Sequence, residues 1–417
     1  MKVLHINAVY GEGSTGVIVE DIHELSMKNG IESCVVYSTS SIASDSIPFG
    51  HAMGKPLGKK IHALLCRING KQAYFSRGAT KKLLMYMDKE KPDIVHLHNL
   101  HSNYIHLNLL LDYLAKKDIS TVITLHDCWF YTGGCFHYTN AKCYGWLKEC
   151  GNCPKKKTDT PALLFDRSAK ILADRKKYFG KIRDLTVVGV SEWITEEGTK
   201  TFLKGRRALP IYNGIDTEFF VNTPSDIKKE LGIEGKFVLL GMSNKWLLSV
   251  NREALDYFSK NLPSDAVMVI VGCNEEQRIS LPSNVIGMDY IRDREVLRRV
   301  YSMADVFVNC TREESLSLVN VESQSCGTPT VTYRNTGAKE TVDHISSFSV
   351  ETENYRDLFE KAMEIKKNGK EAYSEGCREF VKSKFDRDEN YGKYIKLYNT
   401  IYSEKNEGQL RKGGFDG

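Results

Sequence analysis

The sequence predicts an α/β protein built from two doubly wound parallel sheets. Short β-branched segments alternate with helix-like segments, and this alternation is typical of parallel sheets covered by helices. The same alternation restarts after residue 230. The length of 417 residues allows two or three domains, each with a core of its own. We therefore expect two domains that face each other, with ligands outside the carboxyl ends of the strands.

The first half contains a regular series of strands and an amphipathic helix. Residues 16–30 place apolar side chains at helical spacing and end at Gly30, a residue type common at helix C-termini. The elements define an N-terminal domain over residues 1–207 with a cysteine-rich insert at 128–157. The predicted strands of this half are 2–10, 32–39, 92–99, 120–127 and 185–191.

The second half repeats the pattern in a predicted C-terminal domain over residues 236–385. The preceding segment 208–235 is interpreted as a linker, because its first part, 208–220, contains a proline and a glycine and shows no helical period. The predicted strands are 236–243, 266–272, 284–289, 305–311 and 329–333, and the predicted helices are 251–262, 294–304 and 317–326.

The end of the chain predicts one more helix over residues 386–404. Its apolar side chains gather near one face, and we expect this face to pack back on the N-terminal domain. Residues 405–417 read as a disordered tail. The side chains of the predicted apolar face are Tyr391, Tyr394, Leu397 and Tyr398.

Composition excludes several classes of protein. Apolar residues make up 41% and charged residues 27%, which is ordinary for a globular protein. The net charge of +5 is too small to indicate nucleic-acid binding. No signal peptide opens the chain, and no segment approaches the ~20 apolar residues that a bilayer span needs. We therefore expect a cytoplasmic protein.

Basic residues are concentrated in one segment. From His51 to Lys82 the chain carries lysines and arginines but no Asp or Glu. Such a segment could contact anionic lipid at the inner face of the membrane, or a phosphorylated acceptor. It could equally form a solvated surface, and both interpretations stay open.

The stretch "TREESLSLVNVESQSCGTPTV" suggests a ligand site. Glu314 follows the strand at 305–311, and Glu322 lies about two turns into the next helix. Between them the helix begins near Ser317 and Leu318, and its free amides favour phosphate. This layout matches a nucleotide-diphosphate sugar, with Glu322 at the ribose and Glu314 at the sugar. A capping acid plus a solvated acid is the structural alternative.

The same stretch resembles the E-x7-E motif of retaining family 4 glycosyltransferases, which have the GT-B fold of two facing Rossmann-like domains. The segments "VYSMADVFVN", "CGTPTVTYRNTGAKETV", "YNGIDTEFF", "GEGSTGVIVEDI" and "VITLHDCWFYTGGC" resemble the family as well, so the likeness spans about residues 1–345. It implies that Gly13 and Gly16 let the backbone approach the donor or acceptor. It also implies that His126 contacts the donor sugar.

One position departs from the family. An Arg and a Lys usually hold the diphosphate, but here Arg252 is followed by Glu253, which would repel phosphate. Lys245 could replace the missing lysine, Arg252 could act alone, or the donor could bind weakly. In "VHLHNLHSN", three further histidines could line the acceptor side or be structural. They are His96, His98 and His101.

The insert contains four cysteines with a spacing that fits a metal site. Tetrahedral zinc takes four thiolate or imidazole ligands, and disulfides are disfavoured in a reducing cytoplasm. A structural zinc is therefore predicted, with free thiols or disulfides as alternatives and His137 as a substitute ligand. The cysteines are Cys135, Cys143, Cys150 and Cys153.

The resemblance implies a retaining hexosyltransferase. It would move a sugar from a nucleotide-diphosphate donor to a glycan or lipid-linked oligosaccharide, in the synthesis of capsule or exopolysaccharide. No catalytic metal is expected, because helix amides and a basic side chain neutralise the phosphates. The alternatives are a non-catalytic sugar-nucleotide-binding protein, or another GT-B enzyme such as a sugar-nucleotide epimerase. No residue identifies the nucleotide, the sugar or the linkage.

Overall fold

The computed structural model describes residues 1–159 and 161–413, with side chains through residue 408. The chain forms two compact units, which are described separately here. Unit 1 contains residues 1–211 together with the residues from Tyr391 onward, and unit 2 contains Tyr212–Asn390. The boundary between Ile211 and Tyr212 falls inside the predicted linker. Much of that segment is packed, since Phe220, Ile227 and Ile233 belong to the core of unit 2.

Unit 1 is built on a seven-stranded parallel sheet in the order β3-β2-β1-β4-β5-β6-β7. Its central strands are buried on both faces, as expected for a parallel sheet between helices. The strands are β1 (Lys2–Tyr10), β2 (Glu32–Ser40), β3 (Gly50–Ala52), β4 (Ile94–Leu97), β5 (Ser120–Leu125), β6 (Leu185–Gly189) and β7 (Arg207–Pro210).

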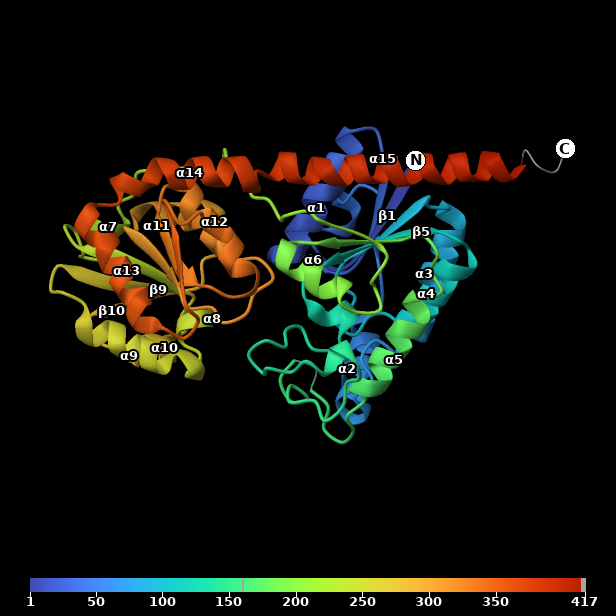
Figure 1. Ribbon diagram of the computed structural model, residues 1–417, viewed down its shortest axis with the longest axis horizontal. Coiled ribbons are helices and arrows are strands. Elements are labelled where there is room, and N and C mark those ends of the chain that lie inside the picture. Colours follow the sequence, from blue (N-terminus) through green and yellow to red (C-terminus); the bar gives the residue numbers. More distant parts are fainter. Residues whose placement is uncertain (160, 414–417) are drawn as a thin grey trace. The chain divides into compact units, whose positions relative to one another are not determined.

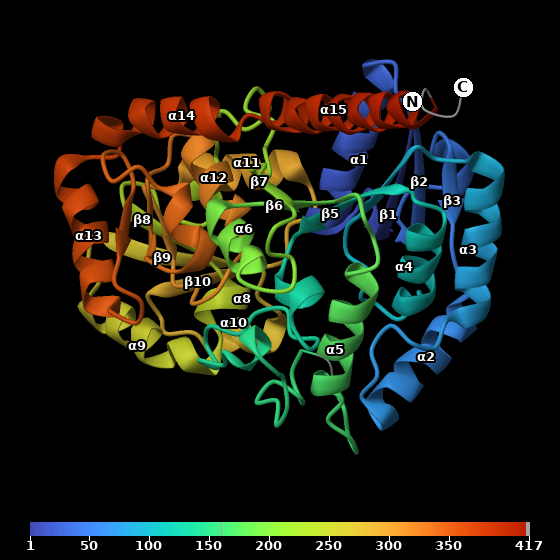
Figure 2. The same ribbon diagram turned by 45° about the vertical axis from the view of Figure 1, so that its right-hand side comes forward.

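Helices cover this sheet (Figures 1 and 2). The contacts of His5 with His23 and of His96 with Tyr398 put α1 and α15 on one face of the sheet. The helices are α1 (Gly13–Lys28), α2 (Pro56–Asn69), α3 (Arg77–Glu90), α4 (Leu107–Lys116), α5 (Ser168–Phe179), α6 (Glu192–Thr199) and α15 (Arg387–Gly413), with 3₁₀ turns η1 (Ser44–Ser46), η2 (Cys128–Tyr131) and η3 (Gly145–Leu147).

Unit 2 repeats this architecture with a six-stranded parallel sheet in the order β10-β9-β8-β11-β12-β13 (yellow to red in Figure 1). Its strands are β8 (Phe237–Met242), β9 (Ala266–Val271), β10 (Val285–Met288), β11 (Val306–Asn309), β12 (Thr330–Tyr333) and β13 (Phe348–Val350). Its helices are α7 (Ile227–Glu230), α8 (Ser243–Trp246), α9 (Arg252–Asn261), α10 (Glu275–Ile279), α11 (Arg294–Met303), α12 (Leu318–Ser325), α13 (Tyr355–Asn368) and α14 (Glu371–Phe385), with 3₁₀ turns η4 (Ser249–Asn251) and η5 (Thr336–Thr341).

Three short edge strands escaped the sequence prediction. Strands β3, β7 and β13 have three or four residues each, which is too short for a periodic pattern to be read. Their pairing with β2, β6 and β12 defines them instead. Among the residues that the structure describes, no helix combines the length and apolarity that crossing a bilayer requires.

The C-terminal helix is longer than predicted. Helix α15 runs from Arg387 to Gly413, so the expectation of a disordered tail is wrong for residues 405–413. No proline or glycine pair interrupts the sequence before Gly413, and the helix therefore continues. Residues 414–417 of the predicted tail lie outside the described residues.

Helix α15 is anchored to the sheet of unit 1 by tyrosines. Tyr398 is fully buried, and its hydroxyl lies 2.7 Å from Nδ1 of His96 on β4. The Tyr394 hydroxyl lies 3.1 Å from Oγ1 of Thr124 on β5. The tyrosine hydroxyls of the predicted apolar face thus hydrogen-bond to polar side chains of the sheet. These buried polar groups are therefore satisfied without water.

Replacing Tyr398 by Ala should lower the free energy of unfolding by about 3–5 kcal/mol, because it removes a buried ring. Tyr398→Phe should lower it by only about 1 kcal/mol, since the hydrogen bond alone is lost. Urea unfolding followed by circular dichroism measures both. Lys396→Ala, on the exposed side of the same helix, should change little. Equal losses for the Ala and Phe variants would contradict the packing described here.

Candidate functional site

One buried side chain ties the end of β11 to the start of α12. The Asn309 amide donates to Ser317 Oγ at 3.0 Å and to Asn320 Oδ1 at 2.8 Å. Its carbonyl oxygen accepts the backbone N–H of Thr311 at 3.0 Å. The Ser317 side chain makes no cap bond to the helix, and the backbone N–H of Asn320 donates to the Ser317 carbonyl oxygen at 3.2 Å, so the open amides of the first turn are those of Leu318 and Val319. This open N-terminus suits an anionic group.

Glu314 lies in the loop before this helix and is held on several sides. Its Oε1 accepts from Lys245 Nζ at 2.7 Å. Its backbone N–H donates to Thr336 Oγ1 at 2.9 Å, and its carbonyl oxygen accepts the Gly337 N–H at 2.9 Å. Its Oε2 is shielded from solvent and has no hydrogen-bond partner among the described residues. One carboxylate oxygen is therefore left to accept from a ligand.

The loop around Glu314 requires glycine at position 337. A Cβ atom there would lie 1.7 Å from the carbonyl oxygen of Ser315, a contact that backbone atoms cannot relieve without moving. Sequence reasoning did not single out Gly337, Thr336 or Asn309, although all three hold the predicted site. The only signal was their place after strands of the sheet, where polar residues are common.

Glu322 lies within α12 and accepts a hydrogen bond from the Tyr301 hydroxyl at 2.8 Å. Burial raises the pKa of Glu322 to about 7, although the Tyr301 hydrogen bond and the charge of Arg294 act in the opposite direction. Both partners come from α11, and sequence reasoning missed them. Near neutral pH the carboxyl is therefore poised between its protonated and ionised forms.

Of the two basic side chains predicted to meet a diphosphate, the structure brings Lys245 to Glu314. The Lys245 side chain is 20% exposed and comes from α8, directly after β8. The Arg252 side chain is 74% exposed and pairs with Asp256 of its own helix at 3.2 Å. The geometry therefore favours Lys245 over Arg252 as the cation of this site.

In unit 1, the predicted glycines form the turn from β1 into α1. Gly13 has φ of +64°, which L side chains rarely adopt. The carbonyl oxygen of Gly16 accepts the Gly11 N–H at 3.2 Å, and a Cβ at Gly16 would lie 3.1 Å from Val9 Cγ2. The turn alone accounts for both glycines, and their contact with a donor remains a prediction.

His126 follows β5 directly, and its Nε2 lies 3.1 Å from His98 Nδ1. Burial lowers the pKa of His126 to about 4, so the imidazole is neutral at neutral pH. Its Nδ1 is shielded from solvent and has no partner among the described residues. The next residue, Asp127, accepts the Trp129 N–H at 2.7 Å and lies 3.2 Å from His101 Nε2.

The three histidines of "VHLHNLHSN" have different surroundings. His96 and His98 are fully buried, so they cannot line an acceptor site, and the structural alternative holds for them. His101 instead lines a pocket formed by α2, the loop after β4 and the cysteine-rich insert. Polar side chains of this pocket are Arg67, Gln72, His101, Ser102, Asn103 and Asp159.

In the part of the chain that the structure describes, no three of the four insert cysteines bring their sulfur atoms within 4.8 Å of one another, so the structure gives the predicted zinc no support. Among the described residues, the group of three candidate ligands within 4.8 Å of one another is made of histidines, not of these cysteines. The thiols are free, and burial raises the pKa of Cys135 to about 12 and that of Cys150 to about 11. The remaining two are Cys143 and Cys153.

Carboxylates contribute to holding the insert. Asp159 Oδ2 accepts the Phe136 N–H at 2.9 Å, and Asp166 Oδ2 accepts the Cys153 N–H at 2.7 Å. Lys155 also pairs with Asp159 at 3.3 Å. The cysteine spacing suggested a metal because sequence alone does not show which backbone amides an acidic side chain will reach.

Two family models match the chain. Residues 19–219 match the model described as Glycosyltransferase Family 4, and residues 237–368 match the model described as Glycosyl transferases group 1. Among known proteins, the putative colanic acid biosynthesis glycosyl transferase WcaC of Escherichia coli K12 is 22% identical over 379 residues. That alignment covers 85% of this chain and 88% of WcaC.

Solved structures show the same fold. Sucrose-phosphate synthase from Thermosynechococcus elongatus matches with a TM-score of 0.66 and 16% identity, covering 97% of this chain and 99% of that protein. HepE of Anabaena, solved in complex with UDP-glucose, matches with a TM-score of 0.63 and 16% identity, covering 96% and 100%. The fold is therefore GT-B, with two Rossmann-like α/β domains.

Glu322→Gln should stabilise the protein at pH 8 but not at pH 4. Because the folded-state pKa is raised to about 7, ionisation of Glu322 costs stability as the pH rises from the unfolded-state value toward 7, and Gln removes this cost. Thermal unfolding across this pH range measures the effect. Glu234→Gln, at an exposed position of unit 2, serves as the matched control and should show no such dependence. Parallel stability curves for Glu322→Gln and the parent protein would contradict the raised pKa.

Proposed function

The chain belongs to the glycosyltransferases of group 1 and family 4, and from this membership we propose that it is a retaining hexosyltransferase that uses a nucleotide-diphosphate sugar. One observation carries the proposal. In unit 2, the Lys245–Glu314 pair precedes an uncapped helix N-terminus, and Glu322 follows within the same helix. A cation, free amides and two acids are thus found at or near the start of one helix, α12.

Each group has a role that fits its surroundings. The amides at Ser317 and Leu318 would bind the diphosphate, and Lys245 would offset its charge. Glu322 would accept hydrogen bonds from the ribose hydroxyls. The vacant Oε2 of Glu314 would accept from the donor sugar, while its Oε1 stays on Lys245. A UDP-glucose complex of the similar HepE supports a donor of this class.

The proposed chemistry takes place on one face of the sugar. The bond from the sugar to the diphosphate breaks, and the acceptor oxygen bonds to the same carbon through an oxocarbenium-like transition state. The leaving diphosphate takes the proton of the acceptor hydroxyl. Amides and Lys245 would stabilise the charge that develops on the leaving group. His126 would contact the donor sugar.

The acceptor is proposed to be a glycan or lipid-linked oligosaccharide of a surface polysaccharide. The name of WcaC, which refers to colanic acid biosynthesis, supports this class. In unit 1, the pocket beside His101 contains Arg67 and lies next to α2. An arginine there could pair with a phosphate of such an acceptor.

Helix α2 supports docking on a membrane at its cytoplasmic face. Its apolar side chains Ile61 and Leu64 are 50% and 57% exposed, and neighbouring basic side chains can contact anionic lipid. The backbone N–H of Leu163 donates to the Arg67 carbonyl oxygen at 2.6 Å, which sets the exposed segment 163–165 beside the helix. The exposed apolar side chains of this membrane-docking patch are Leu57, Ile61, Leu64, Leu65, Ile68, Leu163, Leu164 and Phe165.

Not every lysine of the basic segment belongs to the docking patch. Lys59 Nζ donates to the Ser38 carbonyl oxygen at 2.7 Å, and burial lowers the pKa of this lysine. Lys59 therefore attaches α2 to strand β2 of unit 1. Lys55 and Lys60 are exposed and remain for lipid headgroups.

Glu314→Gln should lower turnover about 10²–10³-fold while leaving nucleotide affinity nearly unchanged, because the charge near the reacting sugar is lost. Glu322→Gln should instead weaken binding of the free nucleotide about 10–100-fold. Titration calorimetry with UDP and GDP, and nucleotide release from a panel of sugar donors, measure the two effects. Glu234→Gln should alter neither. Full nucleotide affinity in Glu322→Gln, or nucleotide-sugar conversion without any acceptor, would contradict the proposal.

The double variant Ile61→Glu/Leu64→Glu should lose at least about tenfold in binding to vesicles of phosphatidylglycerol and phosphatidylethanolamine. Each buried leucine-sized side chain contributes about 1.5–3 kcal/mol. Vesicle co-sedimentation measures the loss, and added salt should weaken the parent protein's binding. The matched control is Ile279→Glu/Ile345→Glu, two exposed positions of unit 2. Equal binding by both double variants, or a dimer that dissociates in Ile61→Glu/Leu64→Glu without any lipid binding, would rule out this patch as a lipid surface.

A further inference from the structure

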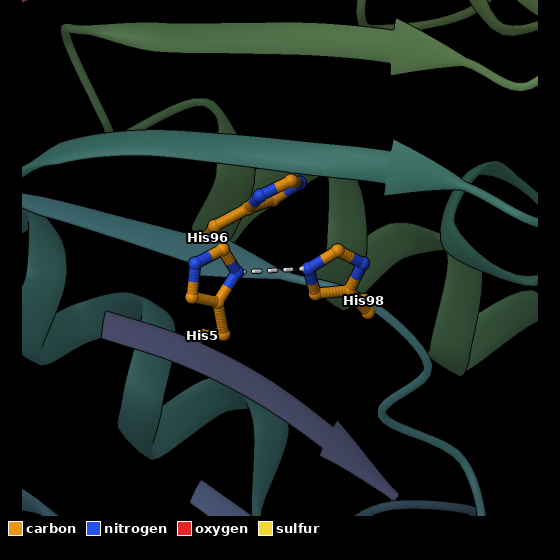
Figure 3. A group of neighbouring side chains, drawn as sticks. All are labelled: His5, His96 and His98. Atoms are coloured by element: carbon orange, nitrogen blue, oxygen red, sulfur yellow. Dashed lines mark hydrogen bonds between the residues drawn. The ribbon is translucent and has the colours of Figure 1, made fainter. Parts of the chain in front are cut away.

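A row of histidine side chains extends across neighbouring strands of the unit 1 sheet and ends at His126. His5 lies on β1, and its Nδ1 is 3.3 Å from Nε2 of His98, which directly follows β4 (Figure 3). The other nitrogen of His98, Nδ1, is 3.1 Å from Nε2 of His126. Three histidines from neighbouring strands are therefore joined nitrogen to nitrogen in the order His5–His98–His126.

Burial keeps every member of this row neutral. It lowers the pKa of His5 to about 3, that of His126 to about 4 and that of His98 well below its usual value. A neutral imidazole carries one N–H and one bare nitrogen. Each hydrogen bond of the row needs one donor and one acceptor, so the tautomer of one ring dictates the tautomer of the next. Only two arrangements of protons are consistent with both bonds.

The two ends of the row distinguish these arrangements. In one, His5 Nδ1–H donates to His98, and His98 Nδ1–H donates to His126, which leaves a bare nitrogen on His5 and an N–H at Nδ1 of His126. In the other, His126 Nε2–H donates to His98, and His98 Nε2–H donates to His5. This leaves a bare Nδ1 on His126 and an N–H without an acceptor at Nε2 of His5. The Nε2 of His5 is buried and has no partner among the described residues. The Nδ1 of His126 is shielded and without a described partner as well, so each arrangement leaves one N–H without an acceptor in the free protein, either at His5 or at His126.

We propose that His5 and His98 are positioning residues that hold His126 in the Nδ1–H tautomer, so that His126 donates a hydrogen bond to a hydroxyl oxygen of the donor sugar. His5 is fully buried, whereas the His126 side chain is partly exposed although its Nδ1 is shielded, so His126 is the end of the row nearer the protein surface. The proposal rests on the proposed function for the identity of that ligand. The tautomer itself depends only on this row.

His96 supports the row without joining it. Its Nδ1 lies 2.7 Å from the Tyr398 hydroxyl and its Nε2 lies 2.7 Å from Thr124 Oγ1. Its ring centre lies 3.9 Å from that of His98, so it packs against the middle member. Helix α15 thereby buttresses the row, through Tyr398, from the C-terminal end of the chain.

The same three histidines His5, His96 and His98 have ligand atoms within 4.8 Å of one another (Figure 3), which raises the alternative of a metal ion. The hydrogen bonds argue against it. Both nitrogens of His96 face hydroxyl groups, and both nitrogens of His98 face other imidazoles. A metal would have to replace contacts that already satisfy these nitrogens, so the hydrogen-bonded row is the better assignment.

Two substitutions of His98 separate positioning from packing. The side-chain amide of Asn can place an N–H near the position of Nδ1, so His98→Asn should keep the donor to His126. His98→Leu removes that donor. Both variants lose the contact with His5, so their thermal stabilities should fall similarly. The expected difference lies in His126: donor-sugar kcat/KM falls about tenfold or more in His98→Leu and is largely restored in His98→Asn. Affinity for the free nucleotide, which depends on unit 2, should stay unchanged in both.

The tautomer is measured directly by ¹⁵N NMR of histidine-labelled full-length protein, with the His126 signals assigned from a His126→Gln sample. The parent protein and His98→Asn should show a protonated Nδ1 and a bare Nε2 at His126, and His98→Leu should show the opposite tautomer or a mixture. This readout needs no turnover, so it remains decisive if the chain transfers no sugar. A bare Nδ1 in the parent protein, the same tautomer in all three proteins, or near-stoichiometric metal that is lost in His98→Leu would overturn the proposal.

Discussion

The clamp made by Asn309 is the contact on which the rest of the candidate site depends. This one amide joins the end of β11 to the start of α12 and occupies the Ser317 hydroxyl that would otherwise cap the helix. The amides of Leu318 and Val319 therefore stay open, and the loop that carries Glu314 is held between strand and helix. A buried amide that lost these partners would leave unsatisfied polar groups, so the clamp also resists change.

The candidate site of unit 2 gathers groups whose hydrogen bonding is incomplete within the protein. Glu314 has one vacant oxygen, the first turn of α12 has free amides, and Glu322 has a pKa raised to about 7. Such groups cost stability in the free protein, and a complementary ligand would recover that cost. Unit 1 shows the same feature at His126, whose Nδ1 lacks a described partner. Both sites lie directly after strands of a parallel sheet, where such groups converge.

A basic side chain lies beside Glu314 although the sequence departs from the family pattern at Glu253. Glu253 occupies the position where a lysine is expected, and Arg252 pairs with Asp256 instead of reaching inward. Lys245 supplies the positive charge from the end of the preceding strand. Its ion pair with Glu314, at 2.7 Å, sets an acid and a base side by side, so the proposed donor would meet both groups together.

The sequence by itself determined the two α/β domains, most of their strands and the positions of Glu314, Glu322 and His126, because periodicity and motif spacing are local properties of a chain. It did not determine the short edge strands, the length of α15 or the way the cysteine-rich insert is held. It also left the choice between Arg252 and Lys245 open. Only the tertiary structure decided these points and revealed the row His5–His98–His126, because each depends on which side chains from distant segments meet once parallel strands are set in register.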